Sequence, residues 1–232
     1  MVPVSVVDEI SHATSSRDNA PLVRNSLRQP WTPYRSFLKR GLDIILVLAS
    51  APIVLPLVVL FAMMIAASGG SPFYSQTRVG KNGRRFRLHK LRTMLPNAEA
   101  LLEDRLRTCP ATHAEWTHTQ KLKSDPRITR LGRFLRKTSL DELPQFYNVL
   151  IGDMSLVGPR PIMVSQVELY PGIAYYRLRP GISGPWQVSD RNACSFADRA
   201  RYDEAYERDL SLGTDLRVLA ATTVVVLRGT GH

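Results

Sequence analysis

An uncharged apolar run constrains this chain more than any other feature. From Ile44 to Ala67 the sequence reads IILVLASAPIVLPLVVLFAMMIAA, 24 residues without a charged side chain. A straight helix of that length measures about 36 Å, and the hydrocarbon core of a bilayer is roughly 30 Å thick. The core helix of a soluble protein is the alternative, but such helices rarely extend so far without a polar face. The run also begins too far into the chain for a signal peptide. It predicts a membrane segment.

Two prolines and the flanking charges predict the topology of this segment. Pro52 and Pro56 fall near its middle, and each removes a backbone donor and clashes with the preceding turn. Basic residues lie close to both ends of the run, so both ends favour the cytoplasmic side. We therefore expect a re-entrant helix–break–helix over residues 37–70 with its apex in the bilayer. The flanking basic residues are Arg35, Lys39 and Arg40 before the run and Arg78, Lys81, Arg84, Arg85 and Arg87 after it.

The rest of the chain predicts a mobile leader and an α+β domain that is mainly helical. Residues 1–36 are rich in Ser, Pro, Asn and Arg and lack periodicity, which is typical of a flexible tail. In residues 71–232, alternating stretches on either side of Asn82-Gly83 predict a small β-hairpin. Residues 96–107 form an amphipathic helical pattern, which the sequence leaves free to lie at the membrane interface or to pack on the domain. Residues 218–227 form an apolar helical stretch too short to span a bilayer.

The positive charge is concentrated in one block. The chain carries 31 Lys and Arg against 20 Asp and Glu, a formal charge of +11, and residues 71–140 alone account for a surplus of that size. Such a block must meet polyanions, which could be nucleic acid, anionic lipid or phosphorylated substrates. Only two cysteines are present, Cys109 and Cys194, so neither a disulfide framework nor a zinc site is indicated, and a reducing compartment is expected.

Several long motifs in a fixed order identify a family resemblance. They resemble the polyprenyl-phosphate hexose-1-phosphate transferases, the monotopic phosphoglycosyl transferases that begin bacterial surface-glycan assembly. The likeness covers about residues 37–230 and is closest in layout to the compact enzymes that initiate exopolysaccharide synthesis. Its elements are KRGLD at 39–43, HKLRTM at 89–94, RKTSLDELPQ at 136–145, GDMSLVGPRP at 152–161, RLRPGISGPWQV at 177–188 and YDEAYERDLSLGTDL at 202–216.

The resemblance implies a reaction, a location and a set of partners. The family moves a sugar-1-phosphate from a UDP-sugar to undecaprenyl phosphate and releases UMP. Galactose or glucose is the sugar that the overall likeness favours, and an acetamido sugar stays open. The implied site lies at the cytoplasmic face of the bacterial inner membrane, ringed by interfacial amphipathic helices. Membrane lipids and downstream glycosyltransferases are the implied partners, and a homodimer stays open. Nucleic acid is not expected, because the basic block lacks helix-turn-helix, zinc and aromatic stacking signatures.

An adjacent pair of acids carries the chemistry that the resemblance implies. Asp141 matches the family's nucleophile, a carboxylate that attacks the sugar-bearing phosphate, and Glu142 matches the residue that holds Mg²⁺. The same residues have a plainer interpretation, because Ser139-x-x-Glu142 fits a helix-capping box. The two interpretations are compatible, since a helix N-terminus favours an ionised carboxylate.

Basic and acidic partners follow by matching motif to motif. In the family these positions bind or orient phosphate, a task that suits the two-pronged donor geometry of arginine. A solvated surface charge is the plain alternative for each basic residue. The two further acids order basic side chains or assist metal binding. The basic residues are Lys90, Arg136, Arg160 and Arg191, and the further acids are Asp203 and Asp215.

Two departures from the family pattern leave other functions open. The family has a Ser-Pro pair at the helix break, whereas this chain has Leu55-Pro56 with Ser50 and Pro52 upstream. Asp190 stands where the family has glycine, which places an acid beside Arg191. Two alternatives to the transferase stay open. One is an impaired relative that acts as a scaffold for glycan assembly, and the other, which the basic charge suggests, is a membrane-anchored nucleic-acid binder.

Overall fold

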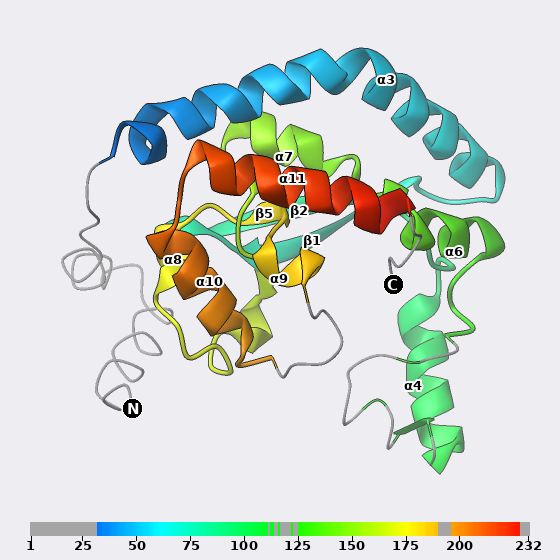
Figure 1. Ribbon diagram of the computed structural model, residues 1–232. Helices are drawn as coiled ribbons and strands as arrows, with labels where there is room; N and C mark the ends of the chain where they lie inside the picture. Colours follow the sequence, from blue (N-terminus) through cyan, green and yellow to red (C-terminus); the bar gives the residue numbers. More distant parts are fainter. Residues whose placement is uncertain are drawn as a thin grey trace.

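The computed structural model describes residues 32–110, 112–113, 116, 122, 125–189 and 196–227. Most of the predicted tail lies outside these residues. Its last described part turns into a π-helical segment, η1 (Tyr34–Leu38), which leads directly into the first long helix. The described chain is mainly helical with a small sheet, as the sequence predicts (Figure 1).

The apolar run forms one helix, α3 (Lys39–Ala67). The prediction that the helix breaks at the prolines is therefore wrong. Helical geometry continues through Pro52 and Pro56, and the helix arches over the molecule instead of splitting in two (Figure 1). Each proline removes one hydrogen bond, which bends a helix but leaves the neighbouring turns intact. Pro52 has no N–H, so the Leu48 carbonyl, four residues earlier, loses its helical partner. The Ser50 hydroxyl does not replace that partner, because it donates to the Val47 carbonyl at 2.9 Å. Ser50 therefore does not replace the family's serine.

The predicted hairpin is confirmed. β1 (Phe73–Val79) and β2 (Arg85–Leu91) pair antiparallel from Phe73 opposite Leu91 to Val79 opposite Arg85. The connection contains a single 3-10 turn, η2 (Lys81–Gly83), in which Asn82 and Gly83 both have positive φ, as an Asn-Gly turn requires. β4 (Ile162–Met163) adds to β1, giving a sheet of order β2-β1-β4.

Short elements wrap the hairpin and form the rest of the domain. The parallel pair β3–β5 makes a second small sheet beside it. α4, predicted at 96–107, extends away from the body beneath α6 (Figure 1). The apolar stretch predicted at 218–227 is the second half of α11. The elements are α4 (Ala98–Thr108), α6 (Arg130–Lys137), η3 (Leu140–Glu142), α7 (Gln145–Ile151), β3 (Ser155–Val157), η4 (Val164–Gln166), α8 (Ala174–Arg177), β5 (Gly181–Ser183), α9 (Pro185–Val188), α10 (Arg199–Arg208) and α11 (Leu212–Leu227).

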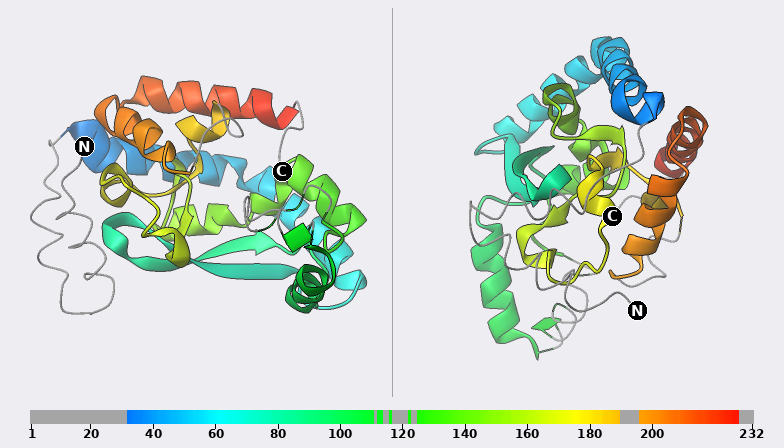
Figure 2. Two further views of the ribbon diagram at one scale, coloured as in Figure 1. Left: turned by 90° about the horizontal axis from the view of Figure 1, so that it is seen from below. Right: turned by 90° about the vertical axis from the view of Figure 1, so that its left-hand side faces the viewer.

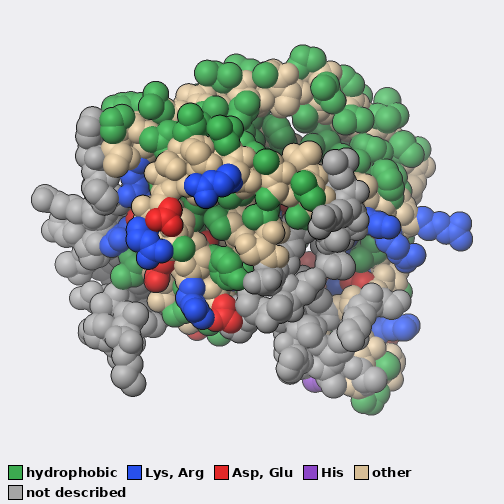
Figure 3. Space-filling view, viewed as in Figure 1, with side chains coloured by type: hydrophobic (Ala, Val, Ile, Leu, Met, Phe, Trp, Pro, Cys, Tyr) green, Lys and Arg blue, Asp and Glu red, His purple; other side chains and the backbone are tan. Residues whose placement is uncertain are grey.

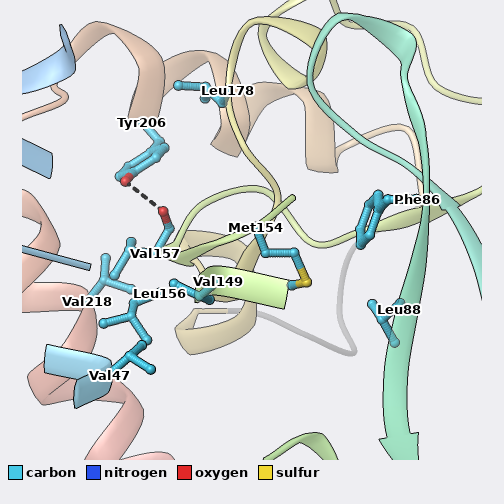
Figure 4. Close-up of a cluster of buried hydrophobic side chains, with 10 residues drawn as sticks. All are labelled: Val47, Phe86, Leu88, Val149, Met154, Leu156, Val157, Leu178, Tyr206 and Val218. Carbon is cyan, nitrogen blue, oxygen red and sulfur yellow. Dashed lines mark hydrogen bonds between the residues drawn. The ribbon is translucent and has the colours of Figure 1, made fainter. Parts of the chain in front are cut away.

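Three buried clusters join these elements. The largest lies where α3, α7, β2, β3 and α11 meet, and in it the Tyr206 hydroxyl lies 3.2 Å from the Val157 carbonyl oxygen (Figure 4). A second, rich in tyrosine, packs around Tyr170 and Tyr175 between β1 and α8. A third joins the far end of α3 to β2 and α6 through Ile65, Leu91 and Leu135. The hairpin lies along one side of the molecule, with α3 and α11 on the opposite side (Figure 2).

Both ends of α3 are attached to the same body, while its outer surface remains apolar. Val47 belongs to the largest cluster and Ile65 to the third. Near the start of the helix, the Asp43 carboxylate accepts hydrogen bonds from Ser155 Oγ at 2.8 Å and from the Leu156 amide at 3.0 Å. Apolar side chains cover the outer side of the arch (Figure 3). The large exposed ones on α3 are Ile45, Leu48, Ile53, Leu55, Val59, Leu60, Met63 and Met64.

Candidate active site

Asp141 and Glu142 lie on η3, the tight turn between α6 and α7, and the capping box is absent. Ser139 adopts a left-handed conformation with φ of 58° and makes no side-chain cap to this turn. Its carbonyl, not its hydroxyl, accepts from the Glu142 amide at 3.2 Å. The left-handed residue turns the chain sharply, so Asp141 is carried inward and only 7% of it stays exposed. Helix capping therefore does not explain the pair.

Lys90 and Arg160 converge on Glu142. Lys90, near the end of β2, places its Nζ 2.6 Å from Glu142 Oε1 and 3.7 Å from Asp141 Oδ2. Arg160, in the loop between β3 and β4, places Nη2 3.5 Å from the same Glu142 oxygen. Three motifs far apart in the sequence thus meet at one carboxylate. The juxtaposition expected for Lys90, Arg160 and the acid pair is present.

Arg136 approaches the pair from the α6 side. Its Nε donates to Thr93 Oγ1 at 2.8 Å, and its charge lowers the pKa of Asp141. Thr93 in turn is bound to the start of α6, because its carbonyl accepts from the Thr129 amide at 3.0 Å. The loop before α6 is fixed by a buried bidentate pair between Arg127 and Asp125. The contact with Thr93 therefore holds Arg136 in place on the Asp141 side of α6.

Burial dominates the electrostatics of Asp141. Desolvation raises the pKa of its carboxyl, and the adjacent Glu142 raises it further, while Lys90 and Arg136 oppose them. The helix N-terminus was expected to favour the ionised form, but the structural setting acts the other way because the side chain is withdrawn from water. A perturbed carboxyl beside specific charged partners is a common mark of a functional site.

Arg78 is a fourth cation of this region that the sequence analysis named only as a flanking charge. On β1, its Nη1 donates to the Pro161 carbonyl at 3.2 Å, next to Arg160, and its Nη2 donates to Gln76 Oε1 at 2.6 Å. Burial and the charge of Arg160 lower the pKa of Arg78. Its place among the basic residues that follow the apolar run was the available signal. Lys90 and Arg160 contact the carboxylates, and the charges of Arg78 and Arg136 act on Glu142 and Asp141, which makes a net positive site suited to phosphate groups.

A magnesium ion fits this site only together with a phosphate ligand. Among the residues that the structure describes, no three His, Cys, Asp or Glu side chains converge as a metal cage. Mg²⁺ commonly takes one or two carboxylates and completes its shell with water and substrate phosphates. Glu142 would supply such a carboxylate, and the surrounding cations would hold the phosphates that complete the shell.

The remaining predicted residues lie in other parts of the structure. Asp203 on α10 is buried and accepts from the Tyr170 hydroxyl at 2.6 Å, and burial raises its pKa to about 7. Asp215 on α11 accepts from Lys39 Nζ at 2.6 Å, and from two tyrosine hydroxyls as well. Asp215 thus orders a lysine side chain, which was one of the two roles expected for it. That lysine lies at the start of α3. Arg191 and Asp190 lie outside the described residues.

A comparison with protein families agrees with this geometry. A family model described as bacterial sugar transferase matches residues 34–229, which include every element of the site. The chain belongs to the bacterial sugar transferase family. The match begins at the first turn of η1, so the family unit contains the arched helix as well as the domain beneath it.

Individual relatives support the same assignment. The chain is 46% identical over 197 residues to a UDP-galactose-lipid carrier transferase of Erwinia amylovora, covering 84% of this sugar transferase and 41% of the relative. It is 41% identical over 202 residues to the exopolysaccharide production protein ExoY of Rhizobium meliloti, covering 86% and 89%. It is 30% identical over 233 residues to a UDP-glucose:undecaprenyl-phosphate glucose-1-phosphate transferase of Escherichia coli, covering 96% and 47%. The chain therefore spans less than half the length of two of these relatives.

Proposed function

We propose that this chain is a phosphoglycosyl transferase that moves a hexose-1-phosphate, galactose or glucose, from a UDP-sugar to undecaprenyl phosphate. The reaction would be the first membrane step of exopolysaccharide or other surface-glycan synthesis. One observation carries the proposal: the buried Asp141 lies beside Glu142, on which Lys90 and Arg160 converge. Family membership and the relatives' names support the same substrates.

The proposed chemistry has two displacements at one phosphorus atom. A carboxylate oxygen of Asp141 bonds to the sugar-bearing phosphorus, and the bond from that phosphorus to the bridging oxygen breaks, so UMP leaves with the bridging oxygen. A phosphate oxygen of undecaprenyl phosphate then attacks the same phosphorus, the bond to Asp141 breaks, and the carboxylate is restored. Covalent catalysis of this kind divides one encounter between two anions into two easier steps.

The surrounding cations would lower the charge repulsion that opposes both steps. Arg160 and Arg78 approach from the β1–β4 side, and Lys90 and Arg136 approach from β2 and α6. Fixed cations aimed at phosphate oxygens stabilise phosphoryl transfer because positioning and electrostatics supply most of its catalysis. Glu142 would hold Mg²⁺, which when bound neutralises diphosphate oxygens and the departing phosphate.

Replacement of the nucleophile tests the proposal. Asp141→Asn is expected to abolish UMP release from UDP-hexose with magnesium and undecaprenyl phosphate. It should also abolish trapping of a radiolabelled sugar-phosphate on the protein, because an amide oxygen does not form the acyl phosphate. Asp209→Asn, the same change on an exposed carboxylate, is the matched control and should keep both. Label retained by Asp141→Asn would move the nucleophile elsewhere, and no UMP release by the wild type with any UDP-sugar would refute the activity.

We further propose that α3 enters and leaves the bilayer on the cytoplasmic face of the bacterial inner membrane. The helix from Tyr34 to Ala67 has a mean hydropathy of 2.9 over its most apolar window, with 11% of that window buried. Its two ends pack against one body through Val47 and Ile65. A straight crossing would require that body to lie on both sides of the membrane, whereas an arched helix keeps both ends on one side.

Cysteine accessibility tests this topology. In a chain whose native cysteines have been replaced, single cysteines at Phe37 and Ser71, both exposed and on opposite ends of α3, report the sidedness of each end. An impermeant thiol reagent added to sealed vesicles of one orientation should label both positions or neither. Labelling of only one of them would mean that the helix crosses the membrane.

The sugar is best identified by a panel of UDP-sugars. Relatives that carry galactose and glucose in their names match this chain at 46% and 30% identity, so either is compatible with the family site. UMP release with UDP-galactose, UDP-glucose and their acetamido counterparts, compared by kcat/KM, ranks them directly. A preference for an acetamido sugar would overturn the hexose assignment and leave the reaction class intact.

A further inference from the structure

A buried asparagine joins the two segments that build the site. Asn148 on α7 is 0% exposed. Its Nδ2 donates to the Arg87 carbonyl at 2.7 Å, and its Oδ1 accepts from the His89 amide at 3.1 Å. Both partners are backbone groups of β2, whose other edge pairs with β1. One side-chain amide therefore fills the place of a neighbouring strand, since a carboxamide has the same donor and acceptor as a peptide group.

The two segments joined by this contact are those that carry the opposite charges of the site. Lys90 directly follows His89, one of the two β2 residues that Asn148 binds. α7 begins at Gln145, separated by two residues from the η3 turn, which ends at Glu142. A second contact reinforces the joint, because the His89 ring meets the Tyr147 ring edge-on with centroids 5.7 Å apart. These contacts hold β2 beside α7, and the 2.6 Å contact between Lys90 Nζ and Glu142 Oε1 connects the same two segments.

We propose that Asn148 is a positioning residue, which holds β2 against α7 so that Lys90 stays on the Glu142 carboxylate. A lysine ammonium ends a flexible four-carbon stem, so its position depends on how firmly its backbone is held. Among the described residues, the two bonds of Asn148 are the side-chain hydrogen bonds that join α7 to β2. This inference rests on the proposed function, because it assigns Asn148 a part in the same transfer reaction.

A purely structural role would also explain why the buried Asn148 amide pairs with the backbone groups at the edge of β2. Both roles predict that loss of the amide destabilises the protein, since two half-buried backbone groups lose their partners. Only the positioning role predicts that the contact between Lys90 and Glu142 is lost while the protein is still folded. The test must therefore measure that contact itself.

Carbodiimide coupling measures the contact without using enzyme activity. The reagent joins a lysine amine to a carboxylate only when the two groups are in contact. The full chain is coupled in detergent and digested, and mass spectrometry then quantifies the peptide that links Lys90 to Glu142. Asn148→Leu keeps the approximate volume and removes both bonds. Val149→Ala is the matched control, because Val149 is equally buried on the same helix but packs in the apolar cluster. Lys90→Met is the blank.

The expected result is a loss of coupling that is specific to the asparagine. The yield should fall by at least about tenfold in Asn148→Leu, since a displacement of one ångström already costs on the order of a hundredfold in reactions between positioned groups. It should be unchanged in Val149→Ala. kcat for UMP release should fall with the coupling while KM for the UDP-sugar changes little. Adding Asn148→Leu to Lys90→Met should cause no further loss of rate.

Two other outcomes separate this inference from the proposed function. Full coupling in folded Asn148→Leu, together with UMP release equal to that of Val149→Ala, would overturn the positioning role and leave the transferase standing. A wild type that releases no UMP, with coupling still lost in Asn148→Leu, would refute the proposed function. The role of Asn148 in placing Lys90 on Glu142 would stand. If Asn148→Leu does not fold, Asn148→Asp replaces it, because it keeps the shape and the acceptor for His89 but loses the donor to Arg87. Undiminished coupling in Asn148→Asp would then also overturn the proposal.

Discussion

The same substitution at two helical glycines should change stability in opposite directions. Gly132, in the first turn of α6, packs directly on the backbone of Thr93. A Cβ added there would collide with the Thr93 carbonyl and lie 2.7 Å from its carbon. Gly41 on α3 has no atom within 4 Å of the equivalent position. Gly132→Ala is therefore expected to destabilise the protein and Gly41→Ala to stabilise it slightly.

The magnitudes decide the sign at Gly132. Helix propensity favours alanine over glycine by about 1 kcal/mol in a helix interior. To restore ordinary contact, the Thr93 carbonyl carbon must withdraw by about 0.7 Å and its oxygen, which lies closer to the added Cβ, by more, which takes its bond from the Thr129 amide beyond hydrogen-bond distance. Overpacking costs about 1–3 kcal/mol and a weakened hydrogen bond about 1 kcal/mol. The net effect is a loss of about 2 kcal/mol for Gly132→Ala and a gain of up to about 1 kcal/mol for Gly41→Ala.

Urea denaturation of the detergent-solubilised protein, followed by circular dichroism, measures both variants against the wild type. Because Thr93 Oγ1 also accepts from Arg136, Gly132→Ala should lower the rate of UMP release more than its loss of folded protein explains. Gly132→Ala with a midpoint equal to or above that of the wild type would refute the close contact between α6 and the Thr93 backbone that follows β2. A strongly destabilised Gly41→Ala would refute the open environment of Gly41.

Two further predictions concern buried carboxylates. Burial raises the pKa of Asp203 to about 7 from 3.8, so its contribution to stability is complete below pH 4 and is lost as the pH rises to about 7. That loss is at most about 4 kcal/mol, and Asp203→Asn should flatten the decline of the urea midpoint between pH 4 and 7; a decline that persists in the variant would assign it to another group. Asp43→Ala leaves the Ser155 hydroxyl and the Leu156 amide without their acceptor and should cost about 2–4 kcal/mol in the same assay, whereas Asp104→Ala on an exposed ion pair should change little. Equal midpoints for these two alanine variants would show that Asp43 does not hold α3 to β3.

Much of the fold could be predicted because its signals are local. The Asn82-Gly83 turn fixed the position of the hairpin, since few residues other than these adopt positive φ at low cost. The apolar run and its charged flanks identified α3. The two prolines did not end that helix, because packing at both of its ends maintains the helical path around them. Local rules overestimated the break because they do not include those tertiary contacts.

The candidate site was predictable as a set of residues and not as a geometry. The motifs identified Asp141, Glu142, Lys90 and Arg160, and the fold brings them together. The environment of Asp141 was predicted incorrectly, since the capping rule assumed a helix where the chain makes a left-handed turn at Ser139. That turn buries the carboxyl and raises its pKa.

By itself, the sequence determined the chemical inventory of this protein: a long apolar helix, a basic block and an acid pair in a recognisable order. Only the tertiary structure decided what each charge does, because the pKa and the partner of an ionisable group depend on burial and on residues distant in the chain. Asp215 binds Lys39 at the start of α3, and Glu142 forms ion pairs with Lys90 and Arg160. Asn148 joins β2 to α7 by hydrogen bonds. These contacts connect residues 18 to 176 positions apart, beyond the reach of the local patterns that predict turns and caps.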